Sequence, residues 1–357
     1  MNVQGNPEMT TNPAVSSDAS VVLSVVIPLF NEEANVRTTV DRVAETLRQG
    51  FTAGRWEIVL VNDGSRDNTW QIARQLARLP GYEWLRVTGY ASNRGRGYAL
   101  RTGFAEARGR WIASIDADLS YAPEYIIRMV DRLGQGDDVD IVLASPYMPG
   151  GRVEGVNPIR WAISRLGNVI LSWFMSPGYR LHTLTCVVRA YRREVLESLV
   201  LESDGKELHL EILSKAIMLG YRVAEIPATA CPRKRGASKF RFRRTAASHL
   251  LFAFFAKPII VFGLVGFLFL VGSFLGMGYL FYIWWTPNAV LNPDRPLMTI
   301  IILAFLGGLQ LISFGVIGTQ IVELRKEIVK IQSALQSLRR RPHHPPEAGE
   351  SQEGDTT

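Results

Sequence analysis

The sequence of 357 residues contains only two cysteines, Cys186 and Cys231, and five histidines. Two cysteines cannot build a disulfide framework, and their spacing fits neither a zinc site nor a redox motif. A small disulfide-stapled protein is therefore excluded, and we expect a reducing compartment for the part of the chain that lies in water. With 47% hydrophobic residues, the chain can bury the cores of one or two domains.

Residues 1–20 lack the cationic start and the apolar stretch of a signal peptide, so we expect a disordered N-terminal tail. The formal net charge of +7 is typical of proteins that bind nucleic acid, anionic lipid or phosphate-bearing substrates. The basic residues are clustered beside long apolar runs, and we expect no nucleic-acid partner.

Two long stretches, 258–285 and 297–322, contain no charged residue and exceed the roughly 20 residues that cross a bilayer core as a helix. Basic residues precede the first stretch and follow the second, whereas the connection between them holds one Asp and one Arg. The positive-inside rule therefore predicts a membrane protein with two spans, whose N-terminal domain and both termini are cytoplasmic. A buried hairpin in the core of a soluble protein is the alternative.

Short β-branched runs alternate with helical segments from residue 21 onward. The runs are "VVLSVVIPL", "WEIVLVN", "EWLRVTG", "WIASIDA" and "VDIVLAS". This alternation predicts an α/β domain with a doubly wound, mostly parallel sheet. Because such sheets bind ligands in the crevice at the carboxyl ends of their strands, the site candidates are residues 28–33, 62–65 and 116–118.

Two segments have the pattern of helices at a membrane surface. Residues 159–174 carry an apolar stripe together with two tryptophans and two arginines, which suits a membrane interface and equally a helix packed on the sheet. The apolar stretches downstream favour the interface. Residues 240–257 are expected to be a second interfacial helix that leads into the first span.

Behind the second span, residues 323–340 are expected to form a cytoplasmic helical stem. Its apolar residues recur at spacings of 4, 3, 4 and 3; they are Leu324, Ile328, Ile331, Leu335 and Leu338. A short heptad seam of this kind bundles subunits into a homo-oligomer, although a solvated single stem fits as well. Residues 341–357 are expected to be a disordered tail.

The apolar run at 111–115 stops on Asp116-Ala-Asp118, two carboxylates that repel each other unless a cation lies beside them. Mg²⁺ or Mn²⁺ is commonly held by one or two carboxylates together with substrate phosphate oxygens. A solvated turn before a helix is the alternative for an isolated Asp-x-Asp. Earlier in the chain, the Gly- and Arg-rich segment 93–109 opens a helix, where backbone N–H groups and guanidinium groups can meet phosphate.

Together and in this order, these motifs resemble glycosyltransferase family 2 enzymes of GT-A fold, and within them the polyprenyl-phosphate (dolichyl-phosphate type) sugar transferases. The matching strings are "SVVIPLFNEEANV", "VNDGSRDNTW", "NRGRGYALRTGFAEARG", "DADLSYAPE", "RAYRREVL", "EILSKAIMLGYRVAEIPAT" and "RKRGASKF". The resemblance implies a glycosyltransferase domain over residues 21–239, followed by a two-helix membrane anchor.

The resemblance also implies roles for individual residues. The catalytic pair would be Asp116 and Asp118, which would hold Mg²⁺ or Mn²⁺ against the diphosphate of a nucleotide-sugar. Asp63 would recognise the base, and the other residues implied at the nucleotide-sugar are Pro28, Phe30, Glu32, Val61, Ala117 and Arg233. Arg165 and Lys239 would bind the phosphate of a polyprenyl phosphate in the bilayer.

Four positions depart from the family pattern. Ser120 replaces a glutamine after the carboxylate pair, Pro146 replaces a phosphate-binding arginine, His182 lies at or near an aspartate position, and Arg96 replaces a lysine. These changes leave the metal site intact, but they bear on the identity of the acceptor and of the sugar.

The implied reaction is an inverting transfer in which a lipid phosphate oxygen attacks the anomeric carbon. The nucleophile is already anionic near neutral pH, so no nucleophile-and-base triad is required. His182 and Glu211 are the candidates for a residue that faces the nucleophile, although an ion-paired surface role fits Glu211 better. The alternatives are an acceptor that is not an isoprenoid and a non-enzymatic membrane scaffold. A polysaccharide synthase would carry a Q-x-x-R-W motif, and none occurs here.

Overall fold

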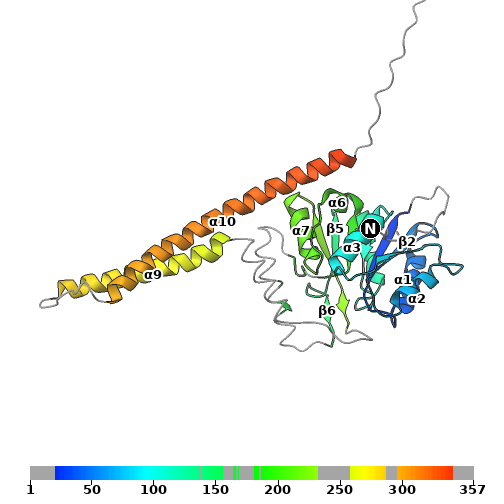
Figure 1. The fold of residues 1–357 in the computed structure, drawn as a ribbon, viewed down its shortest axis with the longest axis horizontal. Coiled ribbons are helices and arrows are strands. Elements are labelled where there is room, and N and C mark those ends of the chain that lie inside the picture. The colour runs from blue at the N-terminus through cyan, green and yellow to red at the C-terminus, as the bar shows by residue number, and fades with distance from the viewer. Residues whose placement is uncertain are drawn as a thin grey trace, which may run out of the picture.

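A computed structural model describes residues 21–136, 138–155, 164–165, 168, 181–184, 186–231, 258–286 and 296–340. An α/β domain and a long pair of helices make up these residues (Figure 1). The predicted interfacial helix at 240–257 and most of the one at 159–174 lie outside the described residues, as do both predicted tails.

One seven-stranded sheet forms the centre of the domain. Its strands are β1 (Leu23–Leu29), β2 (Trp56–Asp63), β3 (Leu85–Tyr90), β4 (Trp111–Ser114), β5 (Ile141–Ser145), β7 (Arg189–Arg192) and β8 (Val223–Pro227). The spatial order is β3-β2-β1-β4-β7-β5-β8, and β7 alone in this sheet runs antiparallel to its neighbours. The predicted doubly wound, mostly parallel sheet is therefore confirmed, with the five predicted runs as β1 to β5.

Helices cover both faces of the sheet. They are α1 (Val36–Gly50), α2 (Thr69–Leu76), α3 (Arg96–Glu106), α4 (Glu124–Gly134), α6 (Arg193–Ser198) and α7 (Leu208–Met218). Alternate residues of a strand point to opposite faces. Accordingly, Val25 and Ile27 of β1 lie in a core cluster with α1, α2 and α4, whereas Val26 lies in a second cluster with α3, α6 and α7. Burial on both faces explains why the strands read as continuous apolar runs.

A proline marks the place where the central strands separate. Strand β1 pairs with β2 along its whole length, but its pairing with β4 ends at Val26 and Ser114. Pro28 follows two residues later and has no N–H to donate to a ladder. Strand order also reverses at β1 and β4, so the sheet has its switch point where these two strands part.

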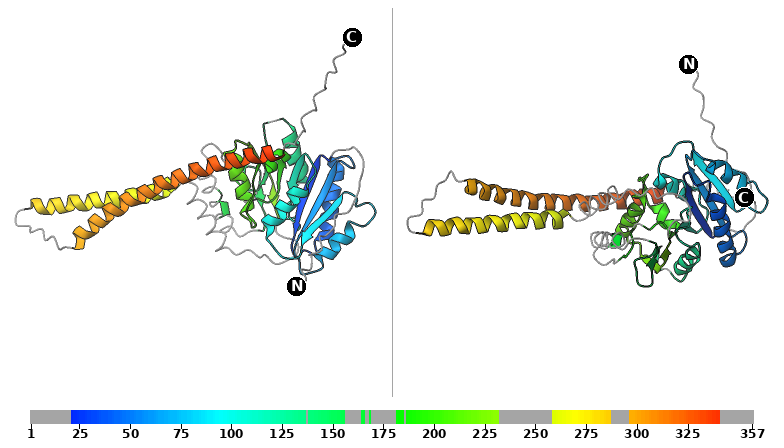
Figure 2. Two further views of the ribbon diagram at one scale, coloured as in Figure 1. Left: turned by 45° about the horizontal axis from the view of Figure 1, so that its top comes forward. Right: turned by 90° about the horizontal axis from the view of Figure 1, so that it is seen from below.

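Helices α9 (Pro258–Trp285) and α10 (Pro296–Arg340) pack against each other along the apolar stretches (Figure 2). Small residues allow close approach: a Cβ atom added to Gly266 would lie 2.7 Å from the carbonyl oxygen of Gly308. Only 11% and 17% of their most apolar windows are buried, which argues against the buried-core hairpin and makes both helices candidate membrane spans.

Helix α10 continues without a break through the second apolar stretch and the stem. Its far end contacts α6 and α7 of the domain (Figure 1). A cavity of about 500 Å³ lies at this junction, between α3, α6 and Gln336 of α10. None of the strand-end carboxylates lines this cavity.

Candidate active site

The carboxyl ends of β1, β2 and β4 lie at one edge of the sheet, because these strands are neighbours and parallel. Two residues with side chains adopt left-handed backbone conformations there: Asn31 after β1, with φ 54°, and Leu119 after β4, with φ 50°. Conformations of this kind are unfavourable for residues other than glycine and cluster at functional sites. The strand ends selected from the sequence are therefore also the places where the backbone is strained.

The two carboxylates after β4 have different partners. Asp116 accepts an ion-paired hydrogen bond from Nη2 of Arg96, the first residue of α3. Asp118 is 7% exposed and accepts hydrogen bonds from the backbone N–H of Ser120, at 3.0 Å, and from the Ser120 hydroxyl. The Ser120 hydroxyl, at the position where the family has a glutamine, thus lies at the Asp118 carboxylate.

The donor set at this place consists of carboxylate and hydroxyl oxygens, which suit hard cations such as Mg²⁺ and Mn²⁺. Within the described ranges, no group of three or more His, Cys, Asp and Glu side chains could hold a metal ion. A cation at Asp116 and Asp118 would therefore take its other ligands from substrate phosphate and water, which is the usual arrangement for Mg²⁺.

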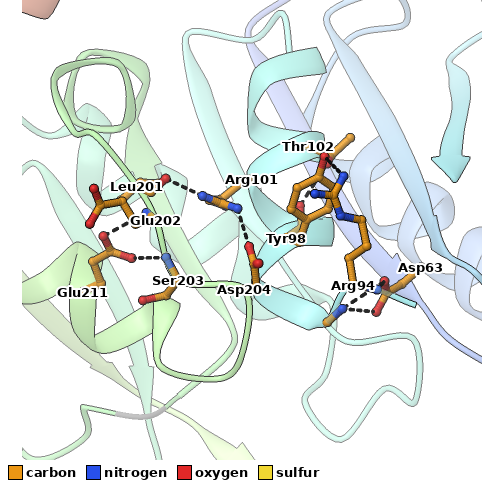
Figure 3. Close-up of polar contacts among 11 residues, drawn as sticks. Asp63, Arg94, Tyr98, Arg101, Thr102, Leu201, Glu202, Ser203, Asp204 and Glu211 are labelled. Carbon is orange, nitrogen blue, oxygen red and sulfur yellow. Dashed lines mark hydrogen bonds and ion pairs between the residues drawn. The ribbon is translucent and has the colours of Figure 1, made fainter. Parts of the chain in front are cut away.

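Asp63, the last residue of β2, is 3% exposed and holds the segment that leads into α3. Its carboxylate accepts a hydrogen bond from the backbone N–H of Arg94 at 2.8 Å (Figure 3). It also accepts hydrogen bonds from the Asn93 side chain at 2.8 Å and from the backbone N–H of Gly95 at 3.2 Å. A carboxylate has about four lone-pair sites, so a base that bonds Asp63 would share it with this segment. Burial and the nearby Asp63 carboxylate raise the pKa of Tyr90.

The start of α3 differs from the expectation that its N–H groups are available to phosphate. The N–H groups of Gly97 and Tyr98 both donate to the Asp204 carbonyl, at 2.7 and 3.1 Å. A Cβ atom added to Gly97 would lie 2.5 Å from the Gly205 carbonyl oxygen, so the loop before α7 packs directly on this helix end. Of the N–H groups at this helix start, these two already donate to a carbonyl of the protein.

Side chains in the same region contribute cationic groups instead. Arg94 stacks on the Tyr98 ring at 3.7 Å and donates to its hydroxyl at 2.6 Å. Arg101, one turn further along α3, binds the Leu201 carbonyl and the Asp204 carboxylate (Figure 3). Arg101 is thus neutralised by Asp204 and faces the cavity beside α6, whereas Arg94 packs on Tyr98 next to the Asp63 segment.

The residues implied at the nucleotide have varied surroundings. Pro28 and Phe30 are half-buried at the end of β1, and Glu32 donates its N–H to Thr69 at 2.8 Å and accepts from Asn35 at 2.7 Å. Val61 is fully buried in the core, in register with Pro28. Ala117 is 4% exposed, and its carbonyl accepts the Thr39 hydroxyl at 2.5 Å.

Strand β9 (Thr229–Ala230), paired with β6 (Arg152–Val153), brings the chain beside the carboxylate pair. The N–H of Cys231 donates to the Ser120 carbonyl at 2.8 Å. Arg233 and Lys239 lie outside the described residues, but Arg233 follows this anchored position by two residues. Arg165 is helical and exposed.

The candidates for a residue facing the nucleophile are engaged elsewhere. His182 Nδ1 lies 2.8 Å from Oε2 of Glu225, and His182 is one residue from Thr183, which bonds Ser145 at the end of β5. Glu211 accepts from Lys215 at 2.6 Å and from the N–H groups of Glu202 and Ser203 (Figure 3). Burial alone would raise the pKa of Glu211, but these bonds lower it, so Glu211 is an ion-paired structural carboxylate. Pro146 directly follows β5.

Two buried residues were missed by the sequence reasoning. Arg189 of β7 is 0% exposed and donates to the carbonyls of Leu184, Cys186 and His209. His209 of α7 is 3% exposed, and neither ring nitrogen has a hydrogen-bond partner among the residues that the structure describes. His209 shares a helical stripe with Ile212, Leu213 and Ala216, and a histidine within such an apolar stripe was the available signal.

Comparison with known proteins gives consistent matches. The model of the family "Glycosyl transferase family 2" matches residues 24–200. The polyprenol monophosphomannose synthase of Mycolicibacterium smegmatis is 34% identical over 60% of this chain and 79% of its own length. The undecaprenyl-phosphate 4-deoxy-4-formamido-L-arabinose transferase of Pseudomonas paraeruginosa is 29% identical over 86% of this chain and 87% of its own.

A solved structure of glucosyl-3-phosphoglycerate synthase from Mycobacterium tuberculosis, in complex with Mn²⁺, uridine diphosphate and phosphoglyceric acid, also resembles this chain. It has 21% sequence identity and a TM-score of 0.48, and the match covers 67% of this chain and 78% of that structure.

Proposed function

Because this chain belongs to glycosyl transferase family 2, we propose that it transfers a sugar from a nucleotide-sugar to a polyprenyl phosphate in the membrane. The observation that carries the proposal is the match to the undecaprenyl-phosphate sugar transferase. It covers 86% of this chain and therefore extends beyond the α/β domain into the C-terminal helices. A long isoprenoid acceptor remains in the bilayer, which gives a transferase with membrane helices access to it.

The donor binds at the switch point. Asp63 contacts the base, while Pro28, Phe30 and Glu32 at the end of β1, together with Ala117 and Arg233, line the rest of the nucleotide-sugar. Val61 is fully buried and supports this edge from the core. Support comes from the common edge that the ends of β1, β2 and β4 share, which is where doubly wound sheets bind nucleotides.

Asp116 and Asp118 would hold Mg²⁺ or Mn²⁺, which when bound would supply stabilisation of the charge on the departing diphosphate. Without a cation the two carboxylates would repel each other, and Arg96 neutralises Asp116. Arg96 is therefore well placed to transfer one of its hydrogen bonds to a diphosphate oxygen when the donor arrives.

The reaction is an in-line displacement with inversion. An oxygen of the lipid phosphate forms a bond to the anomeric carbon, the bond from that carbon to the diphosphate breaks, and the nucleoside diphosphate leaves with the electron pair. Since the second pKa of a phosphate monoester is about 6, the nucleophile needs no general base at neutral pH. Arg165 and Lys239 bind the acceptor phosphate, and the protein contributes position and charge.

The domain and both termini face the cytoplasm, since basic residues follow the second span and the connection between the spans has one Asp and one Arg. Copies of the chain associate through the heptad residues of the stem.

A lipid-product assay tests the reaction. The purified full-length protein in detergent receives polyprenyl phosphate, Mn²⁺ and one sugar donor at a time: UDP-glucose, GDP-mannose or a UDP-N-acetylhexosamine. We expect sugar in the lipid phase with one of these donors, and Asp118→Asn should reduce the rate at least 100-fold. Asp138→Asn is the matched control, because Asp138 is an exposed carboxylate paired with Arg132 away from these strand ends.

Retention of nucleotide binding without a lipid product would refute the polyprenyl phosphate assignment and favour an acceptor that is not an isoprenoid. Absence of both nucleotide binding and product would favour the non-enzymatic scaffold.

A further inference from the structure

His209 is an unusual core residue because its ring is buried while, within the described part of the chain, both nitrogens lack a partner. A buried polar atom without a hydrogen bond costs about 1–3 kcal/mol, and most buried side-chain polar atoms in native proteins are bonded. An apolar residue of similar size at this position would avoid that cost. The cost of these unbonded nitrogens suggests that His209 has a role that an apolar residue such as leucine could not fill.

The surroundings of His209 are cationic. His209 is the second residue of α7. The loop before α7 packs on the start of α3, where Arg96 lies. Burial first, and then the charges of Arg189 and Arg96, hold the pKa of His209 well below its usual range. The ring is consequently neutral at physiological pH, with one N–H donor and one acceptor nitrogen.

Arg96 links His209 to the carboxylate pair. One of its terminal nitrogens binds Asp116, while its Nε is buried and has no partner in the described ranges. Arg189, which is in register with Ser114 at the end of β4, donates to the His209 carbonyl at 2.9 Å, so His209 lies near the strand end that leads to Asp116. N–H donors beside two guanidinium groups select an anion with several oxygen acceptors, and a phosphate is such an anion.

We infer that His209 and Arg96 together bind a phosphate oxygen at the active site. The inference rests on the proposed function, which supplies two sources for that oxygen: the diphosphate of the donor and the phosphate of the lipid acceptor. His209 is then a substrate-binding residue that confers phosphate affinity and lowers stability in the free protein.

The test separates this role from packing by replacing His209 with a similarly sized apolar residue. In the full-length protein, His209→Leu removes the unsatisfied nitrogens, so the unfolding temperature should equal or exceed that of the wild type. Affinity for the phosphate ligand should fall about tenfold, because a hydrogen bond to a charged group is lost. His209→Gln keeps a donor and an acceptor and should retain most of the affinity, and Ile212→Val one turn away controls for packing.

Two titrations identify the source of the oxygen. One uses UDP and GDP with Mg²⁺, and the other uses undecaprenyl phosphate in nanodiscs, with phosphate-free nanodiscs as blank. If His209→Leu loses affinity only for the nucleotides, His209 binds the donor diphosphate. If it loses affinity only for the lipid, His209 binds the acceptor phosphate. Unchanged affinity of His209→Leu for both ligands overturns the inference.

A measurement on the wild type covers the case in which His209→Leu does not fold. Nitrogen-15 resonances of the His209 ring should shift when the phosphate ligand is added, and unchanged resonances under saturation overturn the inference. If the wild type binds neither the nucleotides nor the lipid phosphate, the proposed function fails and this inference fails with it. Wild-type binding with an unaffected His209 contradicts the inference alone.

Discussion

At the scale of single residues, the site is defined by how each buried charge is satisfied. The Asp63 carboxylate holds the 93–95 segment, Arg96 neutralises Asp116, and Arg189 is surrounded by three carbonyls. Sequence reasoning could select Asp63 and Asp116, because each ends an apolar run. It could not select Arg189, because the carbonyls that hold it belong to Leu184 and Cys186 before β7 and to His209 on α7.

His209 predicts a pH dependence of stability. Its folded pKa lies below the unfolded value of about 6.5, because burial and the charges of Arg189 on β7 and Arg96 on α3 disfavour the charged ring. The unfolded state therefore binds more protons below pH 6.5, and the free energy of unfolding falls as the pH drops below that value. The loss should approach roughly 1 kcal/mol per pH unit.

The measurement is the thermal unfolding midpoint of the full-length protein between pH 8 and pH 5. We expect the wild type to lose stability below pH 6.5 and His209→Leu to lose less over the same interval. His182→Leu is the matched control, since His182 is half-exposed beside Glu225. Parallel curves for the wild type and His209→Leu would contradict the prediction.

At the scale of elements, the sequence predicts the five apolar strands β1 to β5, but not the more polar strands β7 and β8. The β-branched runs that became β1 to β5 are buried on both faces, so their composition alone marks them. β7 contains two arginines and β8 contains a proline and a glutamate, and neither looks like a buried strand without knowledge of its neighbours. The occupied start of α3 was missed for the same reason, because the Asp204 carbonyl is about 100 residues away in sequence.

The stem predicts an association between copies of the chain. The apolar stripe of the stem is 54–63% exposed; it consists of Leu324, Ile328, Ile331 and Leu335. Val329, on another side of α10, is only 6% exposed. A 4-3-4 spacing suits a second helix with the same repeat, and two copies anchored in one bilayer present parallel stems. The exposed stripe should therefore pack against the stem of a second copy.

Light scattering of the detergent-solubilised protein tests this association. We expect the wild type to have at least twice the mass of one chain, and the double variant Ile328→Ser, Ile331→Ser to shift toward a single chain. Lys330→Ser is the control, because Lys330 lies between these positions and pairs with Glu327 on its own helix. If the wild type has the mass of one chain, or if the double variant has the same mass as the wild type, the predicted association through the stem is wrong.

At the scale of the whole molecule, helix α10 connects the membrane to the catalytic domain. Its 45 residues extend about 68 Å at 1.5 Å per residue, whereas a bilayer core is about 30 Å thick. More than half of α10 therefore lies outside the core, and its end contacts α6 and α7. This contact allows the stem to hold the strand-end site at a set distance from the lipid.

The orientation of this assembly is tested by labelling single cysteines with a membrane-impermeant maleimide in bacterial spheroplasts. Thr286, at the end of α9, is exposed, and Lys330 lies about 50 Å along α10 from Pro296, beyond the bilayer core. In a Cys231→Ser background, with Cys186 buried, Thr286→Cys should react in intact spheroplasts and Lys330→Cys only after permeabilisation. The reverse pattern would place the domain outside the cell, where nucleotide-sugars are scarce. Labelling of both positions in intact spheroplasts would show that the two helices do not span the membrane.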